Sequence, residues 1–156
     1  MSIKLSKFSK PTLYKNKLKF YAWYLVNITF VNSSLSLSKI KIVLLRLFGA
    51  KIGNGVIINS SINIKFPWNL DIGNNCWLGS HVWIDNTEKV IIENDCCISQ
   101  VVYIVTGNHN FKKETFDYYG KQIKIEAHSW IGAKSIICPD ANVKRDTFTK
   151  IGSIIK

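Results

Sequence analysis

The sequence predicts an all-β core, a parallel β-helix of about five coils, preceded by two N-terminal helices. Two observations indicate the β-helix: aliphatic residues recur every six positions from Ile52 onward, and the residues four positions after them are small or apolar. A third observation indicates the helices, because helical spacing of apolar residues is confined to the first 50 residues. We therefore expect a basic helical segment over residues 1–49 and a β-helix domain over residues 50–156.

The charge of the chain is distributed unevenly. The 156 residues include 21 Lys and Arg against 10 Asp and Glu, and no acidic residue precedes Asp71. Residues 71–156 carry 10 residues of each sign, so the net charge of +11 lies in the first 70 residues. A basic, aromatic-rich N-terminus suits an anionic membrane surface or a phosphate-bearing substrate. No nucleic-acid recognition motif accompanies the charge, so a nucleic-acid partner is not expected.

Targeting and cysteine signals are weak. The first apolar run, residues 20–31, has 12 residues and lacks a small-residue cleavage site, whereas a bilayer span needs about 20 residues. We expect a cytoplasmic protein, and peripheral contact of its N-terminus with the inner face of the cell membrane stays open. The four cysteines show no CxxC spacing, which predicts neither a zinc ribbon nor a disulfide framework.

Two helices are expected before the repeat. Pro11 marks the start of the first, whose apolar residues form one stripe. That stripe favours a helix packed on its own domain, with an interfacial membrane helix as the alternative. The second helix is expected from Lys39 to Phe48, with Ser38 as its cap and Gly49 as its end. The stripe of the first helix consists of Tyr14, Leu18, Tyr21, Leu25 and Ile28.

The six-residue repeat groups into sets of three, which is typical of a triangular coil with one short strand on each side. Fourteen of the fifteen repeat positions are Ile, Leu or Val, and the second inward position assigns Cys76 and Cys96 to the core as small hydrophobes. The repeat positions are Ile52, Ile58, Ile64, Ile72, Leu78, Ile84, Ile92, Ile98, Ile104, Ile125, Ile131, Ile137, Val143, Thr149 and Ile155.

One interruption of the repeat is large. Ile104 and Ile125 are 21 residues apart where six are expected, so a loop over residues 105–124 leaves the coil. The loop begins with the motif Thr-Gly-Asn-His-Asn and contains His109. A histidine where a coil opens into a loop beside Gly107 is a candidate for acid–base chemistry.

Four segments carry a closer resemblance: LLRLFGAKIG (44–53), PWNLDIGNNCWLG (67–79), CISQVVYIVTGNHNF (97–111) and HSWIGAKSIICP (128–139). They resemble the colanic-acid-type exopolysaccharide acetyltransferases of the hexapeptide-repeat group and, more distantly, galactoside and nodulation-factor acetyltransferases. The resemblance implies a left-handed coil, a homotrimer with active sites between subunits, and acetyl-CoA as co-substrate. It also implies transfer to a hydroxyl of a sugar or lipid-linked glycan, a cell-surface polysaccharide precursor, with no metal required.

Site residues follow from the same motifs. His109 matches the family's catalytic histidine, and imidazole, with an unperturbed pKa near ~6.5, suits the general base that accepts the hydroxyl proton. The resemblance assigns coenzyme A binding to Trp130, Gly132 and Ala133, and Ile151 lies where the family pattern also contributes. Substrate candidates are Trp83, Asp85 and Asn108. Large outward-facing apolar residues would be covered in a trimer: Ile57, Trp77, Trp83, Tyr103, Trp130, Ile136 and Phe148.

Two alternatives remain. His81 and His128 are expected to be surface residues, and the three histidines do not reproduce the closely spaced pair of the β-helical carbonic anhydrases. The family pattern usually continues past the last hexad, whereas this sequence ends at Lys156. A C-terminally shortened, non-catalytic trimeric β-helix scaffold is therefore the alternative to an active O-acetyltransferase.

Overall fold

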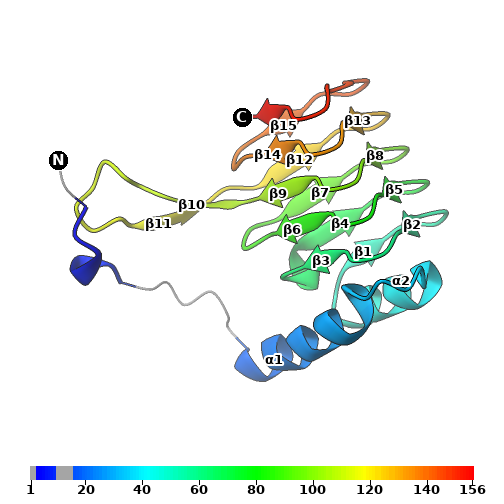
Figure 1. Ribbon diagram of the computed structural model, residues 1–156, viewed down its shortest axis with the longest axis horizontal. Coiled ribbons are helices and arrows are strands. Elements are labelled where there is room, and N and C mark those ends of the chain that lie inside the picture. The colour runs from blue at the N-terminus through cyan, green and yellow to red at the C-terminus, as the bar shows by residue number, and fades with distance from the viewer. Residues whose placement is uncertain (1–2, 10–15) are drawn as a thin grey trace.

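The computed structural model describes residues 3–9 and 16–156, and its core is a parallel β-solenoid of about five turns (Figure 1). Three parallel sheets form its sides. Face A has the order β1 (Lys51–Ile52), β4 (Leu70–Ile72), β7 (Val90–Ile92), β12 (Ile123–Ile125) and β15 (Asn142–Val143). Face B has β2 (Ile57–Ile58), β5 (Trp77–Leu78), β8 (Cys97–Ile98) and β13 (Trp130–Ile131). Face C has β3 (Asn63–Ile64), β6 (Trp83–Asp85), β9 (Tyr103–Val105), β14 (Ile136–Ile137) and β16 (Ile154–Ile155).

The repeat positions form the core, as the spacing predicts. All are buried except Thr149 and Ile155, which are half-buried in the last coil. Cys76 and Cys96 are buried in adjacent coils, which confirms their assignment to the core. The Cys76 thiol donates to the Glu93 carbonyl at 2.9 Å and the Cys96 thiol to the Glu126 carbonyl at 3.3 Å. The interaction between the two side chains lowers the pKa of Cys96 to about 7 and, with burial, raises that of Cys76. Since both side chains are at most 2% exposed, this thiol pair is structural rather than a reactive site.

The two predicted helices are present, and they cover the first coil (Figure 1). Helix α1 (Lys17–Val26) continues into a π-helical turn, η2 (Asn27–Val31), and α2 (Ser38–Leu47) follows; a short 3-10 turn, η1, spans Leu5–Lys7. The indole N–H of Trp23 in α1 donates to the Ile64 carbonyl at 2.8 Å. The ammonium of Lys41 in α2 donates to the Asn59 carbonyl at 2.8 Å. Both bonds satisfy backbone groups that the first coil would otherwise leave unpaired.

The ends of α2 differ in how well the sequence predicts them. Gly49 has φ +104°, and the N–H groups of Gly49 and Ala50 close the last turn onto the carbonyls of Arg46 and Leu45, so Gly49 ends the helix as expected. The predicted cap is wrong, because Ser38 is the first helical residue and its hydroxyl instead accepts from the backbone N–H of Ile58 at 2.9 Å.

The first helix packs on its own domain, as expected, but the predicted stripe does not make the contact. The apolar stripe lies on the exposed side of α1, where Leu18 is 81% and Leu25 is 61% exposed. The opposite side packs on the coil, since Trp23 is buried and the Asn27 amide donates to the Asn63 side chain at 2.7 Å. Polar groups that bond to β3 therefore decide which side faces inward. Pro11 and Tyr14 lie outside the described residues.

The outward positions differ from face to face. Face A has the largely charged and polar column Lys51, Asp71, Ile91, Lys124 and Asn142. Face B has the apolar column Ile57, Trp77, Cys97, Trp130 and Phe148. Face C has the largely apolar column Asn63, Trp83, Tyr103, Ile136 and Ile154.

Candidate active site

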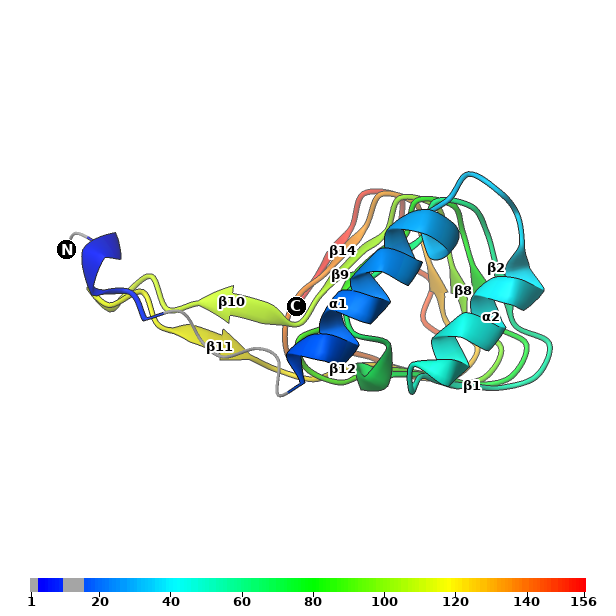
Figure 2. The same ribbon diagram turned by 90° about the horizontal axis from the view of Figure 1, so that it is seen from below.

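The predicted loop is a β-hairpin arm that projects from the solenoid (Figures 1 and 2). Its strands β10 (Gly107–His109) and β11 (Tyr118–Gly120) pair in antiparallel register, with His109 opposite Tyr118. The arm leaves the corner between faces C and A, because β9 precedes it and β12 follows it. Two short insertions in the repeat occur at the same corner, because Ile64 and Ile72, and likewise Ile84 and Ile92, are eight residues apart instead of six. They lie between face C and face A strands.

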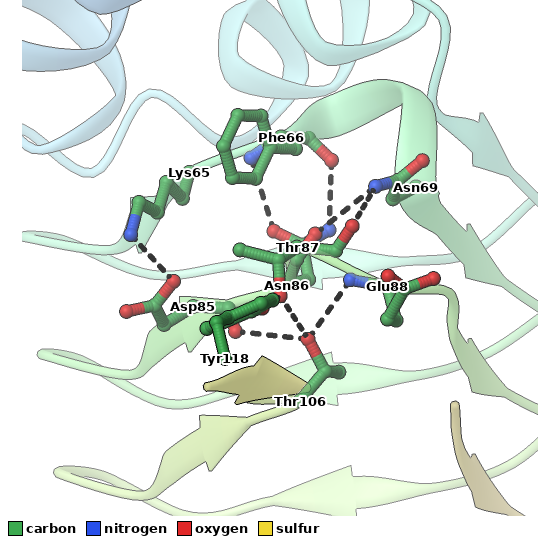
Figure 3. Close-up of polar contacts among 9 residues, drawn as sticks. All are labelled: Lys65, Phe66, Asn69, Asp85, Asn86, Thr87, Glu88, Thr106 and Tyr118. Atoms are coloured by element: carbon green, nitrogen blue, oxygen red, sulfur yellow. Dashed lines mark hydrogen bonds and ion pairs between the residues drawn. The ribbon is translucent and has the colours of Figure 1, made fainter. Parts of the chain in front are cut away.

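A polar network fixes the root of the arm (Figure 3). The hydroxyl of Thr106, which is fully buried, lies 3.1 Å from the Thr87 hydroxyl and accepts from the Glu88 backbone N–H at 2.9 Å. The Tyr118 hydroxyl also bonds to Thr87, and the Lys121 N–H donates to the Thr106 carbonyl at 2.9 Å. Burial raises the pKa of Tyr118, which keeps its hydroxyl protonated in this network.

The buried side-chain amide of Asn86 holds the strand ends next to this root. The side chain of Asn86 accepts from the Phe66 N–H at 3.0 Å and donates to the Phe66 carbonyl at 2.7 Å, which ties two adjacent coils together (Figure 3). Asn69 donates to the carbonyls of Asn86 and Thr87. Because these bonds are buried and paired, the arm starts from a rigid base.

His109 is oriented within the arm by Phe116. Its Nδ1 lies 2.9 Å from the Phe116 carbonyl oxygen, and the two rings stack with centroids 4.4 Å apart and an interplanar angle of 4°. A carbonyl oxygen only accepts, so Nδ1 carries the proton and the neutral ring has its lone pair on Nε2. Tyr118 packs edge-on against the imidazole at 5.5 Å. The ring is thus prepared to accept a proton at Nε2.

The N-terminal segment contacts the same arm. Lys4 and Lys7 form ion pairs with Glu114 at 3.3 and 2.9 Å, and the Lys4 N–H donates to the Glu114 carbonyl. Phe8 packs edge-on against the imidazole of His109 at 5.2 Å. Residues 3–9 therefore cover one side of the histidine.

The three residues that the sequence predicts to bind the sugar substrate lie near the arm, but they do not form one cluster. Trp83 is half exposed on face C beside Tyr103, with ring centroids 4.9 Å apart. Asp85 lies on the same strand and pairs with Lys65 at 2.9 Å (Figure 3). Asn108 is exposed on the arm, and its side-chain oxygen accepts from the His109 N–H at 2.8 Å.

A cavity of about 300 Å³ lies between α1 and face C, and Trp83 is one of its lining residues. Its walls are mainly aromatic and apolar, with three asparagines and one lysine among them. The residues lining it are Phe20, Trp23, Tyr24, Asn27, Ile28, Asn32, Asn63, Lys65 and Trp83. Aromatic walls with a few polar groups are typical of small-molecule sites.

The four predicted coenzyme residues lie in the last two coils. Trp130 is 52% exposed on face B, and its indole N–H donates to the Ser99 hydroxyl at 2.8 Å. Gly132 and Ala133 form the corner between faces B and C, and the Gly152 N–H donates to the Ala133 carbonyl at 2.9 Å. This bond places Ile151, which is exposed, over the same corner. The structure thus brings these four residues to one edge of the solenoid.

His109 and the coenzyme residues lie at different corners of the triangular cross-section. The arm leaves the corner between faces C and A (Figure 2), whereas the strand order puts Gly132 and Ala133 at the corner between faces B and C. His81 and His128 lie in two further turns of the coil, where both are exposed, as expected. The described ranges contain no group of three metal-ligating side chains. One chain therefore does not bring the predicted base and the predicted coenzyme surface together.

Several residues of this site are not singled out by the sequence. Phe116 orients His109 through its backbone carbonyl, which carries no side-chain signal. Tyr118, Thr87 and Thr106 hold the arm, and only Thr106 belongs to a recognised motif. The aromatic composition of residues 111–121 is the signal that points to this part of the loop.

Comparisons with known proteins agree with this architecture. No family model matches the chain. A protein of Escherichia coli (strain K12) named as the colanic acid biosynthesis acetyltransferase WcaF is 33% identical over 142 residues, covering 89% of this chain and 78% of that protein. Nodulation protein L of Rhizobium meliloti (strain 1021) is 27% identical over 92 residues, covering 57% of this chain and 50% of that protein.

Solved structures share the fold at low sequence identity. The hexapeptide-repeat-containing acetyltransferase VCA0836 of Vibrio cholerae has a TM-score of 0.80 and 16% identity, covering 96% of this chain and 84% of that one. Its complex with acetyl coenzyme A has a TM-score of 0.79 and 15% identity, covering 90% and 77%. The fold is therefore that of a known group of solenoid proteins.

Proposed function

The chain belongs to the hexapeptide-repeat acetyltransferases of the WcaF type, and we propose that it transfers an acetyl group from acetyl-CoA to a sugar hydroxyl of a cell-surface polysaccharide precursor. The observation that carries the proposal is the orientation of His109 by the Phe116 carbonyl. That contact leaves Nε2 unprotonated in the neutral ring, as a general base requires.

His109 acts on the acceptor hydroxyl. Its Nε2 takes the proton as the sugar oxygen attacks the acyl carbon, and the imidazolium then returns that proton to the departing sulfur. The products are a sugar ester and a free thiol, so His109 ends in its starting state. Stacking on Phe116 and the bond at Nδ1 hold the ring in one orientation throughout.

We call the edge formed by Trp130, Gly132, Ala133 and Ile151 the donor corner, and its residues suit a long, thin ligand. When bound, acetyl-CoA supplies an activated acetyl thioester. Gly132 is buried against the backbone of Thr149 and Lys150, where no Cβ would fit, and the small side chain of the half-buried Ala133 leaves room for a pantetheine arm outside this corner. Trp130 and Ile151 add exposed apolar surface on either side. We assign coenzyme binding to these four residues.

A homotrimer would complete the site. Faces B and C carry the apolar columns, and face A carries lysines and carboxylates in ion pairs such as Lys89 with Asp71 at 2.7 Å. Contact between face B of one copy and face C of the next closes a ring and leaves face A in solvent. The projecting arm of one copy then lies at the outer edge of the interface, beside face B of a neighbour, which carries Trp130.

We assign the acceptor sugar to the surface beside the arm. Trp83 offers a flat ring, and Asp85 and Asn108 offer hydrogen-bond acceptors on the same side of the solenoid as the root of the arm. The name of the Escherichia coli relative points to a colanic-acid-like acceptor. A surface polysaccharide or its lipid-linked precursor is the substrate class we infer.

The test is transfer of labelled acetyl from acetyl-CoA to deacetylated exopolysaccharide oligosaccharides. The wild-type chain should form an alkali-labile ester, and His109→Ala should lower the rate by about 10²–10⁴-fold. His128→Asn is the matched control, because His128 is an exposed residue at φ +61°, which asparagine tolerates. Full activity of His109→Ala would overturn the assignment. A folded trimer that binds no acetyl-CoA would favour the non-catalytic scaffold.

A further inference from the structure

The two N-terminal helices expose apolar stripes that nothing in the described residues covers. In α1 and η2 the exposed residues fall at helical spacing, and a second exposed stripe runs along α2. Their spacing of three and four residues places each set on one side of its helix. Ile28 also lines the cavity between α1 and face C, so the helical end face is defined as the other six residues: Leu18, Tyr21, Leu25, Ile40, Val43 and Leu47.

The helical end face points away from the solenoid. The opposite sides of α1 and α2 hold the groups that bond to the first coil, namely Trp23 to Ile64 and Lys41 to Asn59. Both helices lie across the same end of the solenoid, in front in the view from below (Figure 2). The two stripes therefore belong to one end surface of the molecule.

The charge around this surface has one sign. Lys17 and Lys39 are exposed beside the stripes, and residues 1–70 contain no acidic residue. A second copy docked end to end would bring these lysines toward one another with no carboxylate in either helix to pair with them. An anionic surface with an apolar interior complements both the charge and the exposed side chains. No helix in the described ranges is long and apolar enough to cross a membrane.

We propose that the helical end face docks on a bilayer that contains anionic phospholipids. Leu18 and Leu47, which are 81% and 75% exposed, enter the interfacial region, and Lys17 and Lys39 pair with lipid phosphates. Each lysine near an anionic surface strengthens binding, and apolar burial adds to it. The solenoid then stands on the membrane with its donor corner at the far end.

The test is flotation of the full chain with vesicles of phosphatidylcholine containing phosphatidylglycerol, and with vesicles of phosphatidylcholine alone. The wild-type chain should float with the anionic vesicles and dissociate as salt is raised. The double variant Leu18→Glu, Leu47→Glu should bind at least about tenfold more weakly, since it replaces two inserted side chains with charges. Both positions are exposed, so the fold should be retained, as circular dichroism would check.

Phe111→Glu is the matched control, because Phe111 is 68% exposed on the arm, outside the helical end face. It should float like the wild type. Equal flotation of the double variant and the wild type would overturn the proposal, as would equal binding to the neutral vesicles. Self-association of the wild type that the double variant abolishes, without flotation, would identify a second copy as the occupant instead. No substrate is present, so failure here is distinct from failure of acetyl transfer.

Discussion

The Nδ1 atom of His109 lies 2.9 Å from the carbonyl oxygen of Phe116, seven residues further along the hairpin arm. This contact joins the end of β10 to the segment that leads into β11, on the side where the rings stack. It links the fold of the arm to its chemistry, because the same bond that closes the hairpin determines which imidazole nitrogen is free.

The tautomer of His109 is directly measurable. In ¹⁵N-labelled protein at a pH where the ring is neutral, its Nδ1 should show the shift of a protonated nitrogen and its Nε2 that of an unprotonated one. The physical reason is that the Phe116 carbonyl accepts and cannot donate. The spectrum of His109→Ala assigns the signals. The reverse pattern, with the proton on Nε2, would contradict the assignment of Nε2 as the base.

The root of the arm should matter for turnover. Tyr118→Phe removes the hydroxyl that bonds to Thr87, which we expect to cost about 1 kcal/mol and to loosen the arm that carries His109. The expected result is a several-fold lower kcat with acetyl-CoA affinity unchanged. Tyr119→Phe is the control, because Tyr119 is the exposed neighbour on the same strand. Equal kcat values for the two variants would show that the bond does not position the arm.

The fold is largely predictable from the sequence, because a solenoid repeats one local rule. Each coil buries aliphatic residues such as Ile58, Leu78 and Ile98 at the same position of adjacent strands, so a six-residue spacing specifies both the strands and their partners. The arm is also predictable in place, since the repeat is interrupted only once by a long segment.

The remaining features depend on contacts that no spacing encodes. The side of α1 that faces the coil is decided by hydrogen bonds from Trp23 and Asn27, which compete successfully with a regular apolar stripe. Ser38 looks like a helix cap but bonds to the first coil instead. His109 stands out in the sequence, whereas its partner is a backbone carbonyl, and any residue could supply that.

The proposed trimer predicts unequal effects on the three faces. Trp77→Glu places a charge in the apolar column of face B and should shift the protein from trimer to monomer in sedimentation velocity. Ile91→Glu makes the same kind of change on face A, between Asp71 and Lys124, and should leave the trimer intact. A monomeric wild type, or dissociation by the face A variant alone, would contradict the arrangement.

Acid stability should depend on Glu93. Its carboxylate accepts from Lys124 at 2.9 Å and from the Ala127 N–H at 3.0 Å, and these bonds, the lysine first, hold its pKa below the ordinary value. A lowered pKa contributes stability at pH values above the unfolded pKa, and this contribution is lost as pH falls through the folded pKa.

The Tm of the wild type should therefore fall as pH is lowered from 6 to 3. Over the same range the Tm of Glu93→Gln should fall by about 1–2 °C less than that of the wild type. The difference is small because the ion pair is near the surface. Glu88→Gln is the control. Glu88 bonds to Thr106 through its backbone N–H, which this substitution leaves in place. Identical pH profiles of the wild type and Glu93→Gln would contradict the role of this carboxylate.

We propose that this chain binds acetyl-CoA at the donor corner, and calorimetric titration of the purified chain with acetyl-CoA tests this most directly. We predict saturable binding near one ligand per chain, weakened in Trp130→Ala, which removes exposed apolar surface from the corner. Binding that is absent from a folded trimer would contradict the account.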